Sequence, residues 1–326
     1  MTKKFLSKNN ITSILYVILL LVSISMLIIL PSIAIRSFLD GVLIWATKVL
    51  PALLPFFILS KLLSYTNFIP KLGSFLSPIT NKLYGVGGVS GYIFAMSIIS
   101  GYPVGAKLTQ DFYENKYFSD KQAYTITSFC STSGPLFILG TVAIGMFNNK
   151  AIGFVILISH ILGAIINGLL YRCKKDNAPR IQNVNMPPQN ILADTMSSSI
   201  ASIMAVGGFI ALFYMFIQIL ISTNILNPLC TLFSKIGIES GITTSIFCGV
   251  IEVTSGCLLL SKIGLSIISL TTIATFLISF GGLSIHAQAF CFLKSFNMKY
   301  RTFLRQKITQ AVISSIIAWV ICIILF

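Results

Sequence analysis

One carboxylate, Glu252, lies well inside an apolar stretch of the sequence, FCGVIEVTSG. A charge at the centre of a membrane-spanning segment costs roughly 2.5–3.5 kcal/mol or more unless it is paired, protonated or hydrated. We therefore predict that Glu252 couples a proton or cation to movement of a substrate, or forms part of a cavity wall. In the alternative interpretation, it lies near a helix end and hydrogen-bonds to Thr254 and Ser255.

Two histidines are further candidates for chemistry. His286 lies beside Ser284 and Gln288, and a side chain that titrates near neutral pH is suited to handling protons or to hydrogen-bonding an anion. We predict coupling for His286 and substrate contacts for its two polar neighbours, with a packing histidine as the alternative. His160 lies in an otherwise apolar segment without such company and is interpreted as structural.

Two clusters of small and hydroxyl residues are candidates for substrate binding. They are predicted to interrupt helices, and a helix N-terminus offers free N–H groups and about half a positive charge to a carboxylate or phosphate. Lys107 would add a whole charge. In the alternative interpretation, these residues only permit close helix packing. The first cluster is Ser100, Gly101, Pro103 and Gly105, and the second is Ser131, Thr132, Ser133 and Gly134.

The sequence lacks the minimum parts of most enzymes. It contains no HExxH, CxxC or GxxxxGKS/T motif and no close carboxylate pair, so metalloprotease, redox and ATP-driven chemistry are disfavoured. The seven cysteines are scattered through apolar stretches and are typical of small buried hydrophobes. GVSG at 88–91, followed by His160, superficially resembles an intramembrane serine protease, but so short a match is common in a chain with 23 glycines. We expect that the protein is not an enzyme, has no catalytic residue, and binds no metal or cofactor.

The composition excludes a soluble globular protein. Of the 326 residues, 55% are hydrophobic and only 10% charged, whereas a soluble domain carries about 25% charged residues. The net charge of +15 is interpreted as the charge that anchors a membrane protein at its cytoplasmic face, because the uncharged runs are too long for a soluble core. We therefore expect a lipid bilayer around the chain and no nucleic-acid partner.

Long apolar segments predict an all-α polytopic membrane protein. Two of them contain clustered Gly, Pro and hydroxyl residues, STSGP in 125–147 and FGGLSIHAQ in 263–293, and are predicted to be re-entrant or broken helical hairpins. About seven full crossings remain, and 71–84 and 227–240 are expected to be short interfacial helices. The apolar segments cover roughly residues 11–35, 38–60, 83–106, 125–147, 151–171, 195–222, 240–261, 263–293 and 308–326.

The distribution of basic residues predicts the orientation. With the N-terminus inside, sixteen of the 23 Lys and Arg residues lie in inner segments and Lys48 lies within a membrane segment. The positive-inside rule therefore favours a cytoplasmic N-terminus and an external C-terminus. The outer segments hold Arg36, Lys107, Lys116, Lys121, Lys150 and Lys235.

Three pairs of similar strings indicate an internal repeat. SYTNFIPKLGSFLSPI (64–79) is similar to STNILNPLCTLFSKI (222–236), SGYPVGAK (100–107) to SGCLLLSK (255–262), and STSGPLFILG (131–140) to SFGGLSIHAQ (279–288). The second match adds Ser255 and Gly256 to the binding candidates. On the predicted topology the repeats are inverted, which is typical of secondary transporters with a midplane site. The predicted parts are an N-terminal transmembrane helix (1–37), a first repeat (38–171), a basic cytoplasmic linker (172–193) and a second, inverted repeat (194–326).

SGYPVGAK, CSTSGPLFILGTVAIGMF and FGGLSIHAQ, in this order, resemble the Gate or nucleoside-recognition superfamily of membrane proteins, and more narrowly its sporulation integral membrane branch, the YlbJ (SpoVV) type. The resemblance covers roughly residues 38–326. It implies a distant relationship to concentrative nucleoside transporters and, for this branch, movement of dipicolinate across a forespore membrane. The functional segments that the resemblance implies are Ser100 to Lys107, which include Tyr102, then Ser131 to Pro135, and Gly281, Gly282, Ser284 and His286.

These observations together predict a secondary transporter or facilitator of a small organic anion. Alternating access at a midplane site is the expected mechanism, dipicolinate during spore formation is the substrate that the resemblance implies, and the bacterial cell membrane or forespore membrane is the expected location. The alternatives are a nucleoside or nucleobase carrier, and a non-transporting scaffold for sporulation or envelope proteins. A homo-oligomer is left open.

Overall fold

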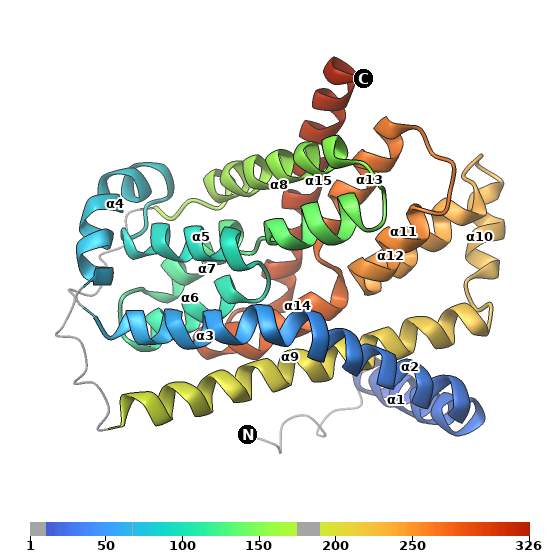
Figure 1. Cartoon of the computed structure of the whole chain (residues 1–326), viewed down its shortest axis with the longest axis horizontal. Helices are drawn as coiled ribbons and strands as arrows, with labels where there is room; N and C mark the ends of the chain where they lie inside the picture. Colours follow the sequence, from blue (N-terminus) through green and yellow to red (C-terminus); the bar gives the residue numbers. More distant parts are fainter. Residues whose placement is uncertain (1–10, 67, 175–189) are drawn as a thin grey trace.

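The computed structural model describes residues 11–66, 68–174 and 190–326, and within these ranges all regular secondary structure is helical (Figure 1). This confirms the all-α class. Most of the predicted basic linker, and Lys3, Lys4 and Lys8 near the N-terminus, lie outside the described residues.

The predicted N-terminal transmembrane helix is not one straight helix, which corrects the expectation for 11–35. Helix α1 (Ile11–Ile29) and helix α2 (Pro31–Ile44) are separated by Leu30, and the chain bends by 105° between them. Pro31 offers no N–H to a continuing helix and disfavours a helical conformation at the residue before it, and Leu30 is non-helical, with φ −119° and ψ 51°. From α2 the chain continues through a π-helical turn, η2 (Trp45–Val49), into α3 (Leu50–Ser64).

Four segments of the described chain are long and apolar enough to cross a membrane. They are α8 (Lys150–Leu170), α9 (Ile191–Ser222), the segment Ile267–Phe296 and α15 (Tyr300–Leu325). Counting each of two bent helix pairs as one span raises the number to six, so the predicted seven crossings are not confirmed. Large apolar side chains on the outer face of α15, such as Trp319 at 50% exposure, are those expected of a lipid-facing surface.

In the first half of the chain, four helices and a π-helix lie between α3 and α8. They are α4 (Phe68–Tyr84), α5 (Val89–Ser100), α6 (Val104–Glu114), α7 (Asp120–Phe129) and η3 (Leu136–Ile144). The predicted interruption at Ser100 to Gly105 is present within the segment 83–106, because Gly101 ends α5 with a left-handed φ of 83°. The predicted interruption at STSGP is confirmed, because 130–134 is non-helical between α7 and η3.

The second half contains the same kinds of elements after α9. They are α10 (Asn227–Ser234), α11 (Ser240–Ile251), α12 (Val253–Leu260), α13 (Ile267–Phe280), α14 (Gly282–Leu293) and the short 3₁₀ helix η4 (Lys294–Phe296). The predicted crossing 240–261 is interrupted at Glu252, whose extended backbone separates α11 from α12. The predicted interruption near FGGL is confirmed at Gly281, where φ is 88°.

The helix boundaries recur at a nearly constant offset. Helices α5 and α11 begin at residues 89 and 240 and end at 100 and 251, so both ends are 151 residues apart. Helices α8 and α15 begin 150 residues apart, at 150 and 300. At this spacing the break after Ser100 lies opposite the break after Ile251, and the match of 100–107 with 255–262 stays a prediction. The inversion of the second repeat stays a prediction, as does the orientation of the termini.

Helices α8, α13 and α15 pack together at the centre of the protein, and α9 runs along α2 and α3 on one side (Figure 1). One apolar cluster lies around α5, α6 and α7, and another joins η3, α8, α12 and α13. Full burial of each large apolar side chain in such clusters contributes roughly 1.5–3 kcal/mol. This packing holds four helix breaks around one cavity. The breaks are those between α5 and α6, α7 and η3, α11 and α12, and α13 and α14.

Candidate functional site

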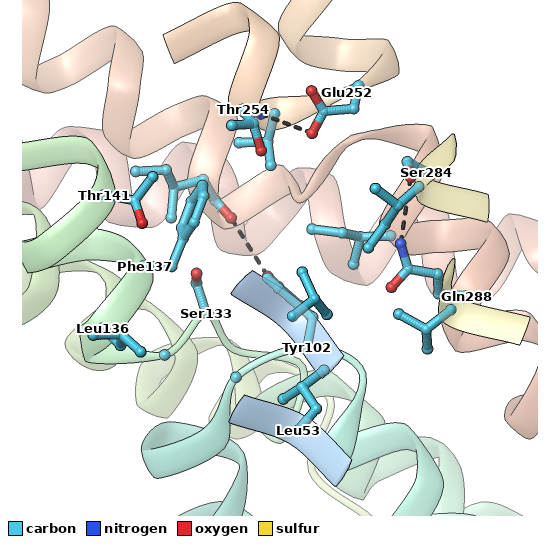
Figure 2. A pocket seen from close by; sticks show the side chains of 18 of the residues that line it. Leu53, Tyr102, Ser133, Leu136, Phe137, Thr141, Glu252, Thr254, Ser284 and Gln288 are labelled. Carbon is cyan, nitrogen blue, oxygen red and sulfur yellow. Dashed lines mark hydrogen bonds between the residues drawn. The ribbon is translucent and has the colours of Figure 1, made fainter. Parts of the chain in front are cut away.

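A cavity of about 220 Å³ lies where four helix interruptions meet. Its walls come from the α5–α6, α7–η3 and α11–α12 breaks and from the first turns of α14, and apolar residues of the α2–α3 segment and of α9, such as Leu53 and Val206, complete the lining (Figure 2). The volume is just below the range of about 300–1,000 Å³ that is typical of ligand sites, so the cavity suits one small molecule. Eight of the residues predicted from the sequence line it: Ser100, Gly101, Tyr102, Ser133, Gly134, Glu252, Ser284 and Gln288.

The first-half wall is formed by the tip of the α5–α6 hairpin pressed against the α7–η3 break. A Cβ atom added to Gly101 would lie 2.6 Å from the backbone nitrogen of Gly134, which is too close for any side chain. A Cβ at Gly105 would overlap the carbonyl oxygen of Cys130. The small residues therefore do permit close packing, as the alternative interpretation held, and the same packing places Ser100 and Ser133 at the cavity.

Glu252 forms part of the opposite wall and also caps a helix. Its carboxylate accepts hydrogen bonds from the backbone N–H groups of Thr254 at 2.9 Å and Ser255 at 2.7 Å, and from the Ser255 hydroxyl at 2.8 Å. A carboxylate at a helix N-terminus is stabilised by the free N–H groups and by the helix dipole. The predicted cavity-wall position and the predicted bonds to Thr254 and Ser255 are therefore both confirmed.

Helix α14 offers a helix start without a side-chain cap. Gly281 adopts a left-handed conformation before the first turn, and no side chain caps the N-terminus. Ser284 and Gln288 lie one turn apart on this helix and both line the cavity, with the Gln288 amide donating to the Ser284 hydroxyl at 3.3 Å (Figure 2). The hydroxyl of Ser100, on the first-half wall, is buried without a hydrogen-bond partner. These groups can bind the polar atoms of a ligand.

Ten predicted residues do not line the cavity. Those nearest its walls are Pro103, Gly105, Ser131, Thr132, Ser255, Gly256, Gly281 and Gly282, which are immediate chain neighbours of lining residues or lie one turn away. Lys107 and His286 are also outside the lining. Predicted residues with hydroxyl groups, such as Ser100, Ser133 and Ser284, therefore line the cavity, whereas the ionisable side chains of Lys107 and His286 do not.

Lys107 does not supply a charge to the cavity. Its ammonium forms an ion pair with Asp111, one turn further along α6, at 2.9 Å, and lies 5.6 Å from the ring centroid of Phe292. The positive charge of Lys107, which was predicted to bind substrate, is therefore neutralised by Asp111 on the same helix.

His286 lies on α14, and its ring packs among aromatic rings outside the cavity. Its Nε2 atom is 2.9 Å from the carbonyl oxygen of Phe280, and its Nδ1 atom is 3.3 Å from the hydroxyl of Tyr300. The ring centroids of Phe280 and Phe303 lie 4.6 and 5.1 Å away. This is the arrangement expected of the packing alternative, although the role of His286 in coupling stays a prediction.

Sequence reasoning missed a buried lysine close to the cavity. Lys307 was assigned to an inner loop, but it lies on α15 with 1% exposure. Its ammonium donates to the Tyr102 hydroxyl at 2.6 Å, the Ser131 carbonyl at 2.9 Å and the Gln310 side-chain oxygen at 2.8 Å. A polar stripe was the available signal, because Lys307, Gln310 and Ser314 recur at helical spacing.

His160 is also more closely connected to the site than the sequence indicated. Its Nε2 atom accepts a hydrogen bond from the backbone N–H of Ser133 at 2.8 Å, and its Nδ1 atom is 2.8 Å from the Ser279 hydroxyl. The ring therefore bridges the α7–η3 break of the first half and the end of α13 in the second half. Its structural interpretation fits this position, and its hydroxyl partner is Ser279 rather than Ser90.

Within the described ranges, no group of three or more His, Cys, Asp or Glu side chains could hold a metal ion. The binding groups of the cavity are hydroxyl, amide and backbone groups, with one carboxylate that is already hydrogen-bonded. Such a site can recognise a small polar molecule by hydrogen bonds.

Comparison with known proteins gives two matches. Residues 46–150 match the family described as Gate, nucleoside recognition, a range that includes the first-half wall of the cavity. The chain is also similar to a Bacillus subtilis (strain 168) protein named sporulation integral membrane protein YlbJ, at 31% identity over 304 residues, which covers 85% of this chain and 74% of the relative. No solved structure matches the chain.

Proposed function

Because the chain belongs to the family of the sporulation integral membrane protein YlbJ, we propose that it is a secondary transporter or facilitator of a small organic anion. Dipicolinate, during spore formation, is the proposed substrate, on the basis of the sequence resemblance. The apolar helices and the name of the relative agree on an integral membrane protein.

The observation that carries the proposal is the origin of the cavity walls. Tyr102 and Ser133 come from the first half of the chain, whereas Glu252 and Ser284 come from the second half. A site between two halves, at breaks in their helices, is exposed to one side or the other when the halves move relative to each other. This arrangement supports alternating access around a bound solute.

Two features support an anionic solute. No side chain caps the start of α14, Ser284 in its first turn lines the cavity, and a helix N-terminus favours negative charge. The ammonium of Lys307 does not line the cavity but donates a hydrogen bond to the hydroxyl of Tyr102, which does. Glu252 opposes an anion less than a free carboxylate would, because its negative charge is held by the α12 N–H groups.

A nucleoside or nucleobase carrier is the second candidate. The Gate family is described by nucleoside recognition, and the neutral hydrogen-bonding groups of Ser100, Thr254 and Gln288 suit hydroxyl and base atoms as well as carboxylates. Competition between the two classes of solute separates the candidates.

Uptake of labelled dipicolinate into proteoliposomes that hold the purified protein tests the proposal, with protein-free liposomes as the control. Saturable uptake that simple dicarboxylates inhibit and nucleosides do not is the expected result. Inhibition by nucleosides alone would favour the second candidate. No uptake above the control, by folded protein with proton and sodium gradients applied, would contradict autonomous dipicolinate transport and favour the scaffold alternative.

A further inference from the structure

Lys307 is a buried lysine whose hydrogen-bond partners are all neutral. Its three acceptors are a phenol hydroxyl, a backbone carbonyl and an amide oxygen, at 2.6, 2.9 and 2.8 Å. The ion pair between Lys107 and Asp111 does not involve Lys307. A buried ammonium without an anionic partner is expensive, because the desolvation of a charge amounts to several kcal/mol in a protein interior. Lys307 therefore lies where a nearby anion would stabilise its charged form.

The cavity is the place from which an anion would act on Lys307. The Tyr102 ring lines the cavity, and the Lys307 nitrogen lies 4.8 Å from the centroid of that ring and 2.6 Å from its hydroxyl oxygen. Ser131, the second partner, lies two residues before the lining residue Ser133.

Several other titratable groups face Lys307 or its partners. His160 on α8 and His286 on α14 lie within electrostatic reach of its ammonium, Tyr102 contacts it directly, and Cys130 precedes its partner Ser131. Both ring nitrogens of His160 already have partners, and those of His286 do as well. None of these groups is an anion that neutralises the lysine at neutral pH.

On the premise of the proposed anion transport, we propose that Lys307 is the group that binds a proton together with the anion. An anion in the cavity favours the ammonium over the neutral amine, and by linkage the ammonium raises the affinity for the anion by the same factor. The balanced step is the transfer of one proton from a buffer acid in solution to the amine as the anion binds, which leaves the conjugate base of the buffer in solution. Lys307 acts through Tyr102 and is thus a positioning and coupling residue rather than a direct ligand.

Calorimetric titration of the purified full-length protein with dipicolinate tests the inference. Measurements in buffers of different ionisation enthalpy count the protons taken up on binding. Between about pH 7.5 and pH 9, the dipicolinate carboxylates stay ionised, and a histidine with an ordinary pKa stays neutral, since the ordinary pKa values of carboxyl and imidazole groups are about 4 and 6.5. We expect proton uptake by the wild-type protein, and an affinity that falls as the pH rises.

Three variants assign this uptake. Lys307→Arg keeps a permanent charge and should bind dipicolinate with no proton uptake from this site. Lys307→Gln keeps a polar side chain without the charge and should bind at least about tenfold more weakly, a coupling of the usual size. Lys299→Gln removes an exposed charge at the start of α15 and should behave like the wild type.

Each outcome decides one of the two proposals. Dipicolinate binding by the wild type without proton uptake, or equal proton uptake by Lys307→Arg, would overturn the role of Lys307 and leave anion transport intact. No dipicolinate binding by folded wild-type protein would overturn the anion proposal itself, and this inference with it. The wild-type titration decides the first point even if a variant does not fold.

Discussion

Replacing Glu252 by Gln tests the helix-capping geometry on which the second-half wall depends. The carboxylate accepts three hydrogen bonds, from two backbone N–H groups of α12 and from the Ser255 hydroxyl. A Gln side chain retains one oxygen and turns an NH₂ group toward donors that need an acceptor.

The expected loss follows from these contacts. One charge-assisted hydrogen bond contributes about 1.5–3 kcal/mol, and a charge at a helix N-terminus contributes about 0.3–1 kcal/mol. We therefore expect Glu252→Gln to lower the free energy of unfolding by about 2–4 kcal/mol. For a large domain, 1 kcal/mol corresponds to roughly 2–4 °C in melting temperature, so the melting temperature should fall by at least about 4 °C.

Thermal unfolding in detergent micelles measures this difference. Glu239→Gln is the matched control, because Glu239 precedes α11 at an exposed position and its side chain makes no cap bond. Its effect should stay within about 0.5 kcal/mol, as for most surface substitutions. Equal melting temperatures for Glu252→Gln and Glu239→Gln would refute the capping geometry.

Two further substitutions test the first-half wall. Tyr102→Phe removes the hydroxyl acceptor of Lys307, and leaving a buried ammonium with one acceptor fewer should cost about 1–3 kcal/mol; an unchanged melting temperature in detergent would contradict this contact. Gly105→Ala places a Cβ on the Cys130 carbonyl oxygen and should reduce the yield of folded protein in size-exclusion chromatography, by about 3 kcal/mol or more of lost stability. Gly264→Ala, with nothing within 4 Å of its Cβ, is the control, and equal yields would show that the hairpin tip is not closely packed.

The sequence predicted the helix breaks at STSGP and FGGL, and missed both the break before Pro31 and the break that a carboxylate makes. STSGP and FGGL contain residues that cannot continue a helix without cost, and both interruptions are present. The chain around Glu252 has no Pro, and its nearest glycines, Gly249 and Gly256, lie inside α11 and α12 rather than at the break, so the segment 240–261 was predicted as one crossing. The available signal was an acidic residue followed by Thr254 and Ser255, which is typical of a helix that begins anew.

Charged side chains were the least predictable part of the site. Lys107 was predicted to bind substrate because its partner Asp111 was not recognised. Helix α6 begins at Val104 and places the two side chains one turn apart, where they form an ion pair. Lys307 was hidden for the opposite reason: its segment was taken to begin at residue 308, although α15 begins at Tyr300. The partners of Lys307 are 205 and 176 residues away in sequence, and no local pattern predicts such contacts.

Uptake of labelled dipicolinate by a protein whose cavity has been filled tests the central claim most directly. Thr141 lines the cavity from η3 (Figure 2), and Thr141→Trp should occupy the space of the substrate, whereas Thr231→Trp changes an exposed position on α10. The account predicts saturable uptake by the wild type and by Thr231→Trp, and at least a tenfold loss, about 1.4 kcal/mol, for folded Thr141→Trp. Undiminished uptake by Thr141→Trp would show that the substrate does not pass through this cavity.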